Sequence, residues 1–425
     1  MLDLRLIRSE PERVKAALAR RGAVEQVDEV LALDARRREL LPALEEAQAE
    51  RNALSKQIGA AKQSGEEAEA ERLMARVGEL KETIEAGKAE LERTEPELRR
   101  LLLSLPNLPD PGSPDGMTEE DAVVVREVGT PPEFDFEPRD HLEIGTELGL
   151  IDIESAARLS GSRFAYLKGD LVMVELALLR FALELARGEG HEPVVPPVLV
   201  REEALEGTGF LPEAREQIYE IPKDELFLSG TSEVALAGLH ADEILEADAL
   251  PLRYSGFSTC FRREAGAAGR DTRGIFRVHQ FDKVEMFSFV EPSASAEEHQ
   301  RLLAIEERIL GELEIPYRVV DVAVGDLGAP AAKKFDCEGW IPSQGRYREL
   351  TSCSNTTDYQ ARRLGARYRP QEGAGPVPVH TLNGTACAIG RTIIALIENR
   401  QERDGSFTIP SVLHRLGAPD RISPR

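Results

Sequence analysis

Residues 29–105 carry a repeating pattern of apolar positions that predicts two long helices. Apolar residues recur at alternating steps of four and three, which is the heptad pattern of a coiled coil. The first run has one polar interruption and comprises Leu40, Leu44, Ala47, Arg51, Leu54, Ile58 and Ala61. The second run comprises Leu73, Val77, Leu80, Ile84, Gly87, Leu91, Thr94, Leu98, Leu101 and Leu105. Because Gly65 can supply a turn between the runs, we expect an antiparallel helical pair.

The sequence also predicts the length of this arm and the effect of a proline within it. Some thirty residues per helix would give an arm about 45 Å long. Pro42 lies inside the first run, and we expect it to kink or restart that helix. Heptads alone favour a dimerising coiled coil or a spacer. The cations of the arm are interleaved with more numerous acids, so any contact with nucleic acid would have to use selected faces.

The helical pattern ends at LPNLPDPGSPDG, residues 105–116, whose four prolines and two glycines are typical of a linker. Beyond it, β-branched and aromatic residues alternate with polar ones in EPVVPPVLV, ELFLSGTSEVAL and DKVEMFSFV, and helical patterns lie between these stretches. This arrangement predicts an N-terminal domain over residues 1–110. It also predicts an α+β domain over residues 111–425, built on a largely antiparallel sheet.

Bulk composition narrows the classes of function. The formal net charge of −23 repels polyanions on average, so nucleic acid could bind only through local basic patches. No stretch approaches the roughly 20 apolar residues of a membrane span, and the N-terminus does not resemble a signal peptide, so we expect a soluble cytoplasmic protein. No C-x-x-C pair occurs, so we expect no zinc, and we interpret the thiols as reduced and mostly buried: Cys260, Cys337, Cys353 and Cys387.

Residues 260–289, CFRREAGAAGRDTRGIFRVHQFDKVEMFSF, concentrate positive charge in this acidic chain. The cations are Arg262, Arg263, Arg270, Arg273, Arg277 and Lys283. CFRRE and FRVHQFDKVEMFSF are predicted strands of a hairpin, so Arg262 and Glu264 should point the same way. Phe281, Lys283, Glu285 and Phe287 should likewise share one face of the return strand.

This hairpin suits an anionic ligand. A guanidinium can fork onto a phosphate, and a carboxylate can accept from an exocyclic amine. The chain has neither a G-x-x-x-x-G-K-[ST] loop nor a G-x-G-x-x-G turn in a βαβ unit, so paired arginines would have to hold any nucleotide phosphates. The alternative for an arbitrary basic hairpin is a solvated loop with local Arg–Glu pairs.

The hairpin resembles a known motif. F-R-x-E, a loop and R-x-x-x-F resemble motif 2 of the class II aminoacyl-tRNA synthetases, and the longer stretch is similar to that of the seryl-tRNA synthetases. GTSEVAL resembles the serine-binding T-x-E element of that family, and ELTSCSNTTDYQARR resembles its E-x-x-S-C-S-N segment. TLNGTACAIGRTIIALIENRQ resembles motif 3, and EPVVPPVLV fits motif 1. Together with the helical arm, the resemblance covers essentially the whole chain.

The resemblance implies a fold, an activity and partners. The fold would be a class II catalytic domain preceded by a tRNA-binding domain with a helical hairpin. The activity would be ATP-dependent activation of L-serine to seryl-adenylate, followed by transfer to the 3′ end of tRNA(Ser), and of tRNA(Sec) where that tRNA exists. Mg²⁺ would accompany ATP, and motif 1 would form a homodimer.

The resemblance also implies site residues. Arg262 and Arg391 would be catalytic, and Glu349 and Ser352 would bind Mg²⁺. The residues implied for ATP are Arg262, Arg263, Glu264, Val278, Glu349, Leu350, Thr351, Ser352 and Arg391. The residues implied for serine are Thr231, Ser232, Glu233, Arg262, Glu285 and Thr385.

Several of these residues have a structural alternative. Glu285 could simply pair with Lys283 in the strand, Thr385 could cap a helix, and Arg391 could lie on the surface. Arg270 and Arg273 could hold a terminal phosphate or tRNA, or they could be solvated loop charges. His279 is interpreted as supporting the loop rather than as catalytic.

Motif 3 departs from the usual N-G-S-G-L-A-V-G-R-T pattern of the family, because this chain has NGTACAIGRT. Thr385 keeps a hydroxyl but adds a methyl group, Ala386 replaces a glycine, and Cys387 replaces a leucine. The sequence leaves open what these changes do to specificity.

Two other functions fit the same fold. A relative that loads a carrier protein should lack the long arm, and this chain has both helical runs. A non-catalytic RNA-binding relative should have lost Arg262, Glu285 or Arg391, and all three are present.

Overall fold

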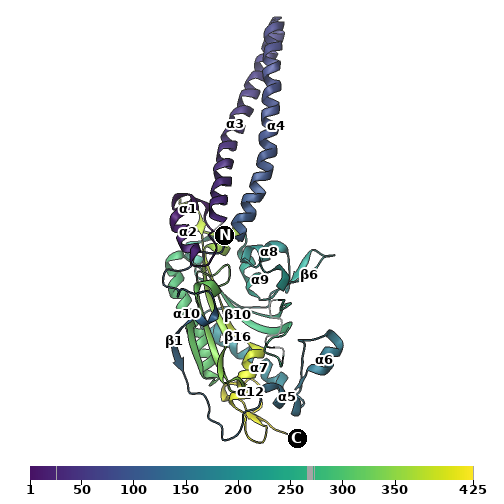
Figure 1. The fold of residues 1–425 in the computed structure, drawn as a ribbon, viewed down its shortest axis with the longest axis vertical. Coiled ribbons are helices and arrows are strands. Elements are labelled where there is room, and N and C mark those ends of the chain that lie inside the picture. The colour runs from purple at the N-terminus through teal and green to yellow at the C-terminus, as the bar shows by residue number, and fades with distance from the viewer. Residues whose placement is uncertain (25, 266–270, 272, 425) are drawn as a thin grey trace. The chain divides into compact units, whose positions relative to one another are not determined.

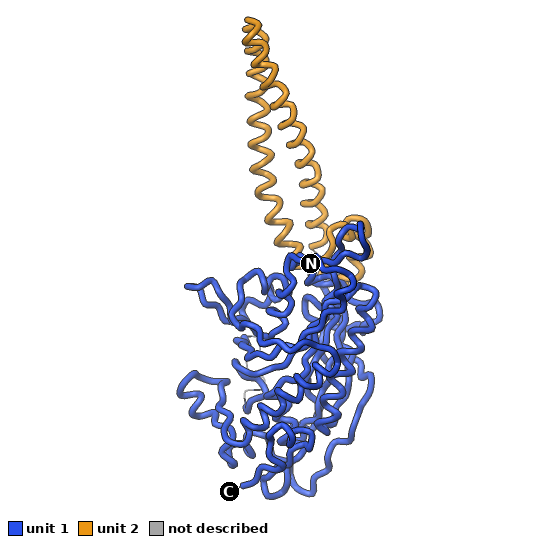
Figure 2. The backbone as a smooth tube through the Cα atoms, turned by 180° about the vertical axis from the view of Figure 1, so that it is seen from behind, with its two compact units in different colours: residues 1, 20–22, 106–425 blue, residues 2–19, 23–105 orange. Residues whose placement is uncertain are grey.

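The computed structural model describes residues 1–24, 26–265, 271 and 273–424. They form two compact units (Figure 2). The smaller comprises Leu2–Ala19 and Ala23–Leu105, and the larger comprises Met1, Arg20–Gly22 and the chain from Pro106 onward. The predicted boundary at residue 110 between two domains of different function stays a prediction.

Four helices build the smaller unit: α1 (Leu4–Ser9), α2 (Pro11–Ala19), α3 (Gln26–Ser64) and α4 (Glu67–Ser104). The long helices α3 and α4 lie side by side as an antiparallel hairpin (Figure 1), which confirms the predicted arm. The turn uses Gly65, whose φ of 74° suits a residue without a Cβ atom. Helix α3 has 39 residues. It is therefore about 58 Å long, so the predicted length was too short.

The heptad seam of the arm is partly buried: Leu40, Leu44, Ala47 and Ala61 of α3 are buried, whereas Arg51, Leu54 and Ile58 are half-buried. Leu44 and Ala47 of α3 pack against Leu80 and Ile84 of α4 and form a small apolar core. α3 continues through Pro42, so the proline does not restart the helix, and the kink stays a prediction. A proline removes one backbone donor from a helix. Contacts with α4 hold the chain on both sides of it, because Arg36 pairs with Glu90 before the proline and Leu44 joins the apolar core after it.

An eight-stranded sheet organises the larger unit. Its strands run in the order β1, β11, β12, β13, β16, β10, β9 and β4, and every described pairing is antiparallel except that of β4 with β9. Their bounds are β1 Val123–Val128, β4 Glu192–Val194, β9 Leu252–Phe261, β10 Gln280–Val290, β11 Tyr317–Asp321, β12 Lys333–Ile341, β13 Arg346–Thr357 and β16 His380–Ala388. This sheet confirms the α+β prediction.

Helices cover both faces of the sheet (Figure 1). Alternate residues of β10 serve different cores, as the two-residue period of a strand requires. Val284 and Met286 join the main core, whereas Phe287 and Phe289 join a second core. Helices of the main core are α7 (Asp170–Gly188), α10 (Ser295–Glu312) and α12 (Ile389–Asn399), and those of the second are α9 (Glu233–Ala237) and α11 (Tyr359–Leu364). Lys283 and Glu285 share the face of Phe287 and therefore point to the α9 side.

Shorter elements complete the described chain. The remaining α-helices are α5 His141–Glu147, α6 Ile153–Ser160, α8 Glu202–Thr208 and α13 Ser411–His414. Small sheets are formed by β2 Ile151–Asp152 with β3 Tyr166–Leu167, by β5 Leu199–Val200, β6 Tyr219–Ile221 and β7 Leu226–Leu228, by β8 Ile244–Glu246, β14 Arg367–Arg369 and β15 Val377–Pro378, and by β17 Phe407–Thr408 with β18 Arg421–Ile422. All four cysteines are free and buried, as expected. Within the described ranges, no helix combines the length and apolarity needed to cross a membrane.

Two glycines of α4 give a matched test of the arm. An added Cβ at Gly87 would lie 2.8 Å from Leu44 Cδ2, whereas one at Gly78 would meet nothing within 4 Å. Both Gly→Ala changes improve helix propensity by about 1 kcal/mol. We expect Gly78→Ala to slow amide hydrogen exchange in the arm severalfold and Gly87→Ala to gain less or to lose protection. Equal protection in both variants would contradict the close approach of the helices.

Candidate active site

A pocket lies on the sheet face that carries Lys283 and Glu285. The cavity itself has a volume of about 160 Å³. Its walls come from β10, β13, β16, the start of α12 and the segments next to the β9–β10 strands. The predicted site residues that line it are Thr231, Glu233, Arg262, Glu264, Val278, Glu285, Glu349, Leu350, Ser352, Thr385 and Arg391.

Three of the predicted residues do not line the pocket. Ser232 is buried, and its hydroxyl donates to the Gly256 carbonyl over 3.1 Å. Arg263 lies over the ring of Tyr219, 5.8 Å from its centroid. Thr351 points to the opposite side of the sheet, where its hydroxyl donates to Glu306 over 2.9 Å.

Arg262 and Glu264 both face the pocket, but strand alternation does not place them there. β9 ends at Phe261 and β10 begins at Gln280, so both residues lie outside the hairpin strands, contrary to prediction. Arg262 is held instead by two hydrogen bonds of 2.9 Å: its N–H donates to the His279 carbonyl, and His279 Nδ1 donates to its carbonyl. Glu264 has a φ of 54°, which turns the chain.

The charged side chains around Arg262 and Glu264 already have partners within the protein. The Arg262 guanidinium donates through Nε to the Gly230 carbonyl over 3.3 Å and lies 5.2 Å from the centroid of the Phe281 ring. Arg277 donates to Glu264 over 2.8 Å. His279 does not line the pocket and holds the backbone of Arg262, as expected for a residue that supports the loop.

Two β-bulges bring functional side chains to the pocket face. In β13, Glu349 and Ser352 are three residues apart and would point to opposite faces of a regular strand. The pairing of β13 with β12 skips Leu350, and both side chains therefore reach the pocket. In β16, the pairing with β10 skips Ala386, so that Thr385 lies opposite Glu285.

The bulge in β16 also separates the three unusual residues of motif 3. Thr385 lines the pocket, whereas Ala386 and Cys387 both belong to the main core on the other side of the sheet. Thr385 lies within β16 rather than at the start of a helix, so it does not act as an N-cap. The departures at Ala386 and Cys387 therefore affect packing beneath the site, and the departure at Thr385 affects the pocket directly.

Glu285 is the centre of a buried polar cluster. It is 1% exposed and receives Lys283 Nζ at 2.6 Å, so the alternative ion pair is present. Thr385 donates to one carboxylate oxygen over 3.0 Å, and Asn383 donates to the other over 3.1 Å. These bonds fix the carboxylate on the pocket face and compensate the cost of its burial.

Glu233 also lies near this cluster, and its pKa is shifted. Burial, together with the negative charge of Glu285, raises the pKa of Glu233 to about 7. Gln360 donates to its carboxyl group over 2.8 Å. Near neutral pH, Glu233 can therefore act as either a donor or an acceptor, whereas Glu285 is held by three donors.

Glu349 and Arg391 form the other end of the pocket. Burial opposes ionisation of Glu349, but the positive charges of Arg391, Lys334 and Arg262 lower its pKa to about 2. Arg391 donates to the Glu349 carbonyl over 2.9 Å and lies 3.4 Å from its carboxylate. Because Arg391 lines the pocket and lies 4.7 Å from the centroid of the Phe276 ring, the alternative of a plain surface residue fails.

Sequence reasoning missed several lining residues. Phe281 and Lys283 could have been found, because they share the predicted strand face of Glu285. Phe210, Phe276 and Asn383 also line the pocket, and no local sequence pattern marks them.

The two loop arginines have different outcomes. Arg273 forms ion pairs with Asp140 at 2.8 Å and with Glu143 at 2.9 Å, so it is not a free cation in this structure. Arg270 lies outside the described residues.

Comparisons with known proteins agree along the whole chain. Residues 1–109 match the seryl-tRNA synthetase N-terminal domain, and residues 218–400 match the tRNA synthetase class II core domain (G, H, P, S and T). Serine–tRNA ligase of Acidothermus cellulolyticus is 52% identical, with 100% of both chains covered. The corresponding ligase of Thermobifida fusca is 51% identical, with 100% of this chain and 99% of the relative covered.

Solved structures give the same result. Seryl-tRNA synthetase of Pyrococcus horikoshii complexed with ATP is 42% identical with a TM-score of 0.94, and the alignment covers 100% of both chains. Cytoplasmic serine–tRNA ligase of Naegleria fowleri in complex with AMP is 33% identical with a TM-score of 0.89, over 100% of this chain and 99% of the other. With about half of all residues identical over its full length, the chain belongs to the seryl-tRNA synthetase family.

Proposed function

We propose that this chain activates L-serine with ATP in the pocket described above and transfers the seryl group to the 3′ end of tRNA(Ser). One observation carries the residue assignments: a single pocket joins the buried Glu285–Thr385 cluster to two arginines, Arg262 and Arg391. The cluster suits a small hydroxylated amino acid, and the arginines suit a polyphosphate.

Charge neutralisation explains the role of the arginines. In the first step, a serine carboxylate oxygen attacks the α-phosphorus of ATP in line, the bond to the bridging oxygen breaks, and pyrophosphate leaves. Two anions must therefore approach each other. Arg262 would hold the α-phosphate and the serine carboxylate, and Arg391 would hold the γ-phosphate end, so that catalysis is mostly positioning and electrostatic stabilisation.

Contacts at the other end of the pocket would select serine. Glu285 would accept hydrogen bonds from the ammonium group, with Glu233, Thr231 and Thr385 around the hydroxyl group. A site built to bond a substrate hydroxyl rejects the analogue that lacks it by about 10⁴-fold or more, which would exclude alanine. Threonine would be excluded by the steric fit of its extra methyl group.

The donor set also fits Mg²⁺. Glu349 and Ser352 both line the pocket, and the low pKa of Glu349 keeps its carboxylate ionised. Mg²⁺ prefers oxygen ligands and usually takes only one or two from the protein when substrate phosphates supply others. Glu349 and Ser352 would hold the ion, and the ion would supply positive charge to the phosphates. No group of three or more His, Cys, Asp or Glu side chains suited to a metal occurs among the described residues.

The remaining assignments concern partners and location. Residues 1–110 would bind tRNA through the α3–α4 arm, and residues 111–425 would form the catalytic domain. Exposed apolar side chains on and near motif 1, Met173, Leu176 and Val195, support a homodimer through that region. We also propose a cytoplasmic location and, where that tRNA exists, charging of tRNA(Sec), both by analogy with the family.

Arg262→Ala tests the catalytic assignment. We expect serine-dependent ATP–pyrophosphate exchange to fall by several orders of magnitude, since Arg262 is the side chain that would join the two anions. Arg308→Ala is the control, because Arg308 is an exposed residue of α10 that pairs with Glu312 and Glu189. A loss below tenfold for Arg262→Ala would contradict its role, and absence of serine-dependent exchange in the unmodified chain would contradict the function itself.

Deletion of residues 33–100 tests the division of labour. We expect adenylate formation to stay largely intact, because the described residues that line the pocket all lie outside the arm, and tRNA charging to become inefficient. Both activities are measured on the same preparation, with circular dichroism to establish folding. A folded truncation that loses both activities would contradict the assignment.

A further inference from the structure

Three segments that are distant in sequence meet at one buried histidine. His141, the first residue of α5, is 5% exposed. Its Nδ1 lies 2.9 Å from Glu398 Oε1 near the end of α12, and its backbone N–H donates to the same oxygen over 3.1 Å. Its Nε2 lies 3.1 Å from the backbone nitrogen of Ile275.

The partners of the ring determine where its proton lies. The Ile275 N–H can only donate, so Nε2 must be the acceptor and Nδ1 must carry the proton that is donated to Glu398. Glu398 is 0% exposed, and its second oxygen accepts from the Ser343 N–H over 3.1 Å. Three N–H donors thus compensate the buried carboxylate, which in turn orients the imidazole.

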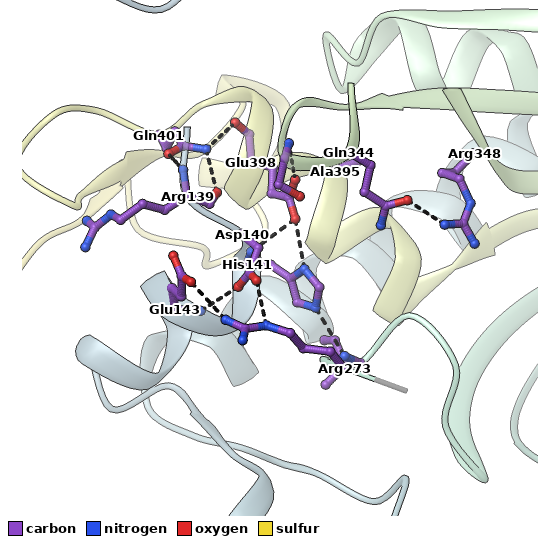
Figure 3. A network of polar contacts seen from close by, with 12 residues as sticks. Arg139, Asp140, His141, Glu143, Arg273, Gln344, Arg348, Ala395, Glu398 and Gln401 are labelled. Atoms are coloured by element: carbon purple, nitrogen blue, oxygen red, sulfur yellow. Dashed lines mark hydrogen bonds and ion pairs between the residues drawn. The ribbon is translucent and has the colours of Figure 1, made fainter. Parts of the chain in front are cut away.

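Residues 273–275 lie directly against the first turn of α5. Gly274 has a φ of 77°, and a Cβ atom there would lie 2.1 Å from His141 Nε2, so the backbone passes directly against the imidazole. Immediately before it, Arg273 forms its ion pairs with Asp140 and Glu143 of the same helix start. Side-chain and backbone contacts together fix this segment to the first turn of α5 (Figure 3).

The fixed segment leads directly into the pocket. Ile275 and the next residue, Phe276, both line it. The Phe276 ring centroid lies 4.0 Å from the guanidinium carbon of Arg348 and 4.7 Å from that of Arg391. Arg391 and Glu398 are both in α12 and are seven residues apart, which is about two turns and places them on the same side of the helix. One helix therefore holds the arginine at the pocket and the carboxylate behind His141.

We propose that His141, held by Glu398, is a positioning residue for ATP. Its bond to the Ile275 N–H fixes Phe276 relative to Arg391, because α12 carries both Arg391 and the partner of His141. This geometry keeps the nucleotide end of the pocket assembled before ATP binds. The inference rests on the proposed function of the pocket, but it concerns residues outside the predicted site.

Two substitutions separate the two bonds of the imidazole. His141→Asn places an amide near the Nδ1 position, so it can still donate to Glu398 but loses the acceptor for Ile275. His141→Gln places an amide oxygen near the Nε2 position, so it keeps that acceptor and weakens the bond to Glu398. If His141 only stabilised the fold, the activity of each variant would change only as far as its thermal stability changes.

Serine-dependent pyrophosphate exchange measures the outcome. We expect His141→Asn to raise KM for ATP about tenfold, the effect of one buried N–H left without a partner, with KM for serine within about twofold. His141→Gln should keep KM for ATP and KM for serine within about threefold of the values for the unmodified chain. His191→Gln, another buried histidine that does not line the pocket, is the control and should leave both KM values unchanged.

Binding measurements cover the case of a poorly folded variant. Glu398→Gln keeps the side-chain volume but weakens the anchor of His141, and we expect calorimetric affinity for a non-hydrolysable ATP analogue to fall in the same direction, by less than in His141→Asn. The inference is overturned if both His141 variants keep KM for ATP within twofold, or if KM for ATP, KM for serine and thermal stability change in parallel. An unmodified chain without serine-dependent exchange would instead overturn the proposed function.

Discussion

The central constraint on the structure is that several negatively charged groups must be held close together in one pocket. The reacting groups of serine and ATP are both anionic, and the pocket that would receive them carries four carboxylates as well as four cations, within an acidic chain. A guanidinium fixed by its backbone can bind two anions at once and reduce their mutual repulsion. Arg262 meets this requirement, because reciprocal bonds with His279 hold its main chain and leave the side chain over the sheet.

The same constraint explains the different states of the carboxyl groups. Glu285 is surrounded by three donors, Glu349 is held ionised by neighbouring cations, and Glu233 is pushed toward neutrality by burial and by Glu285. One pocket can thus offer a fixed anion for an ammonium group, an ionised ligand for a metal ion and a titratable group for a hydroxyl. These differences arise from environment rather than from residue type.

Much of the architecture could be predicted from the sequence, because heptads and strand alternation report burial directly. The arm and the antiparallel sheet belong to this group. The set of site residues was implied instead by the resemblance to a known family. Features that depend on tertiary contacts could not be predicted: the uninterrupted α3 at Pro42, and the ends of β9 and β10, which leave Arg262 and Glu264 outside the strands. The β-bulges at Leu350 and Ala386 are a further case, since each reverses the face on which neighbouring side chains lie. His141 carries no motif at all, and only its neighbours give it a role.

A crystal structure of the chain with ATP and a non-reactive serine analogue tests the central claim most directly. The account predicts that the α-phosphate and the analogue's carboxylate meet at Arg262, with the γ-phosphate at Arg391 and the ammonium group at Glu285. A triphosphate bound away from Arg262, or an amino acid bound away from Glu285, would contradict it.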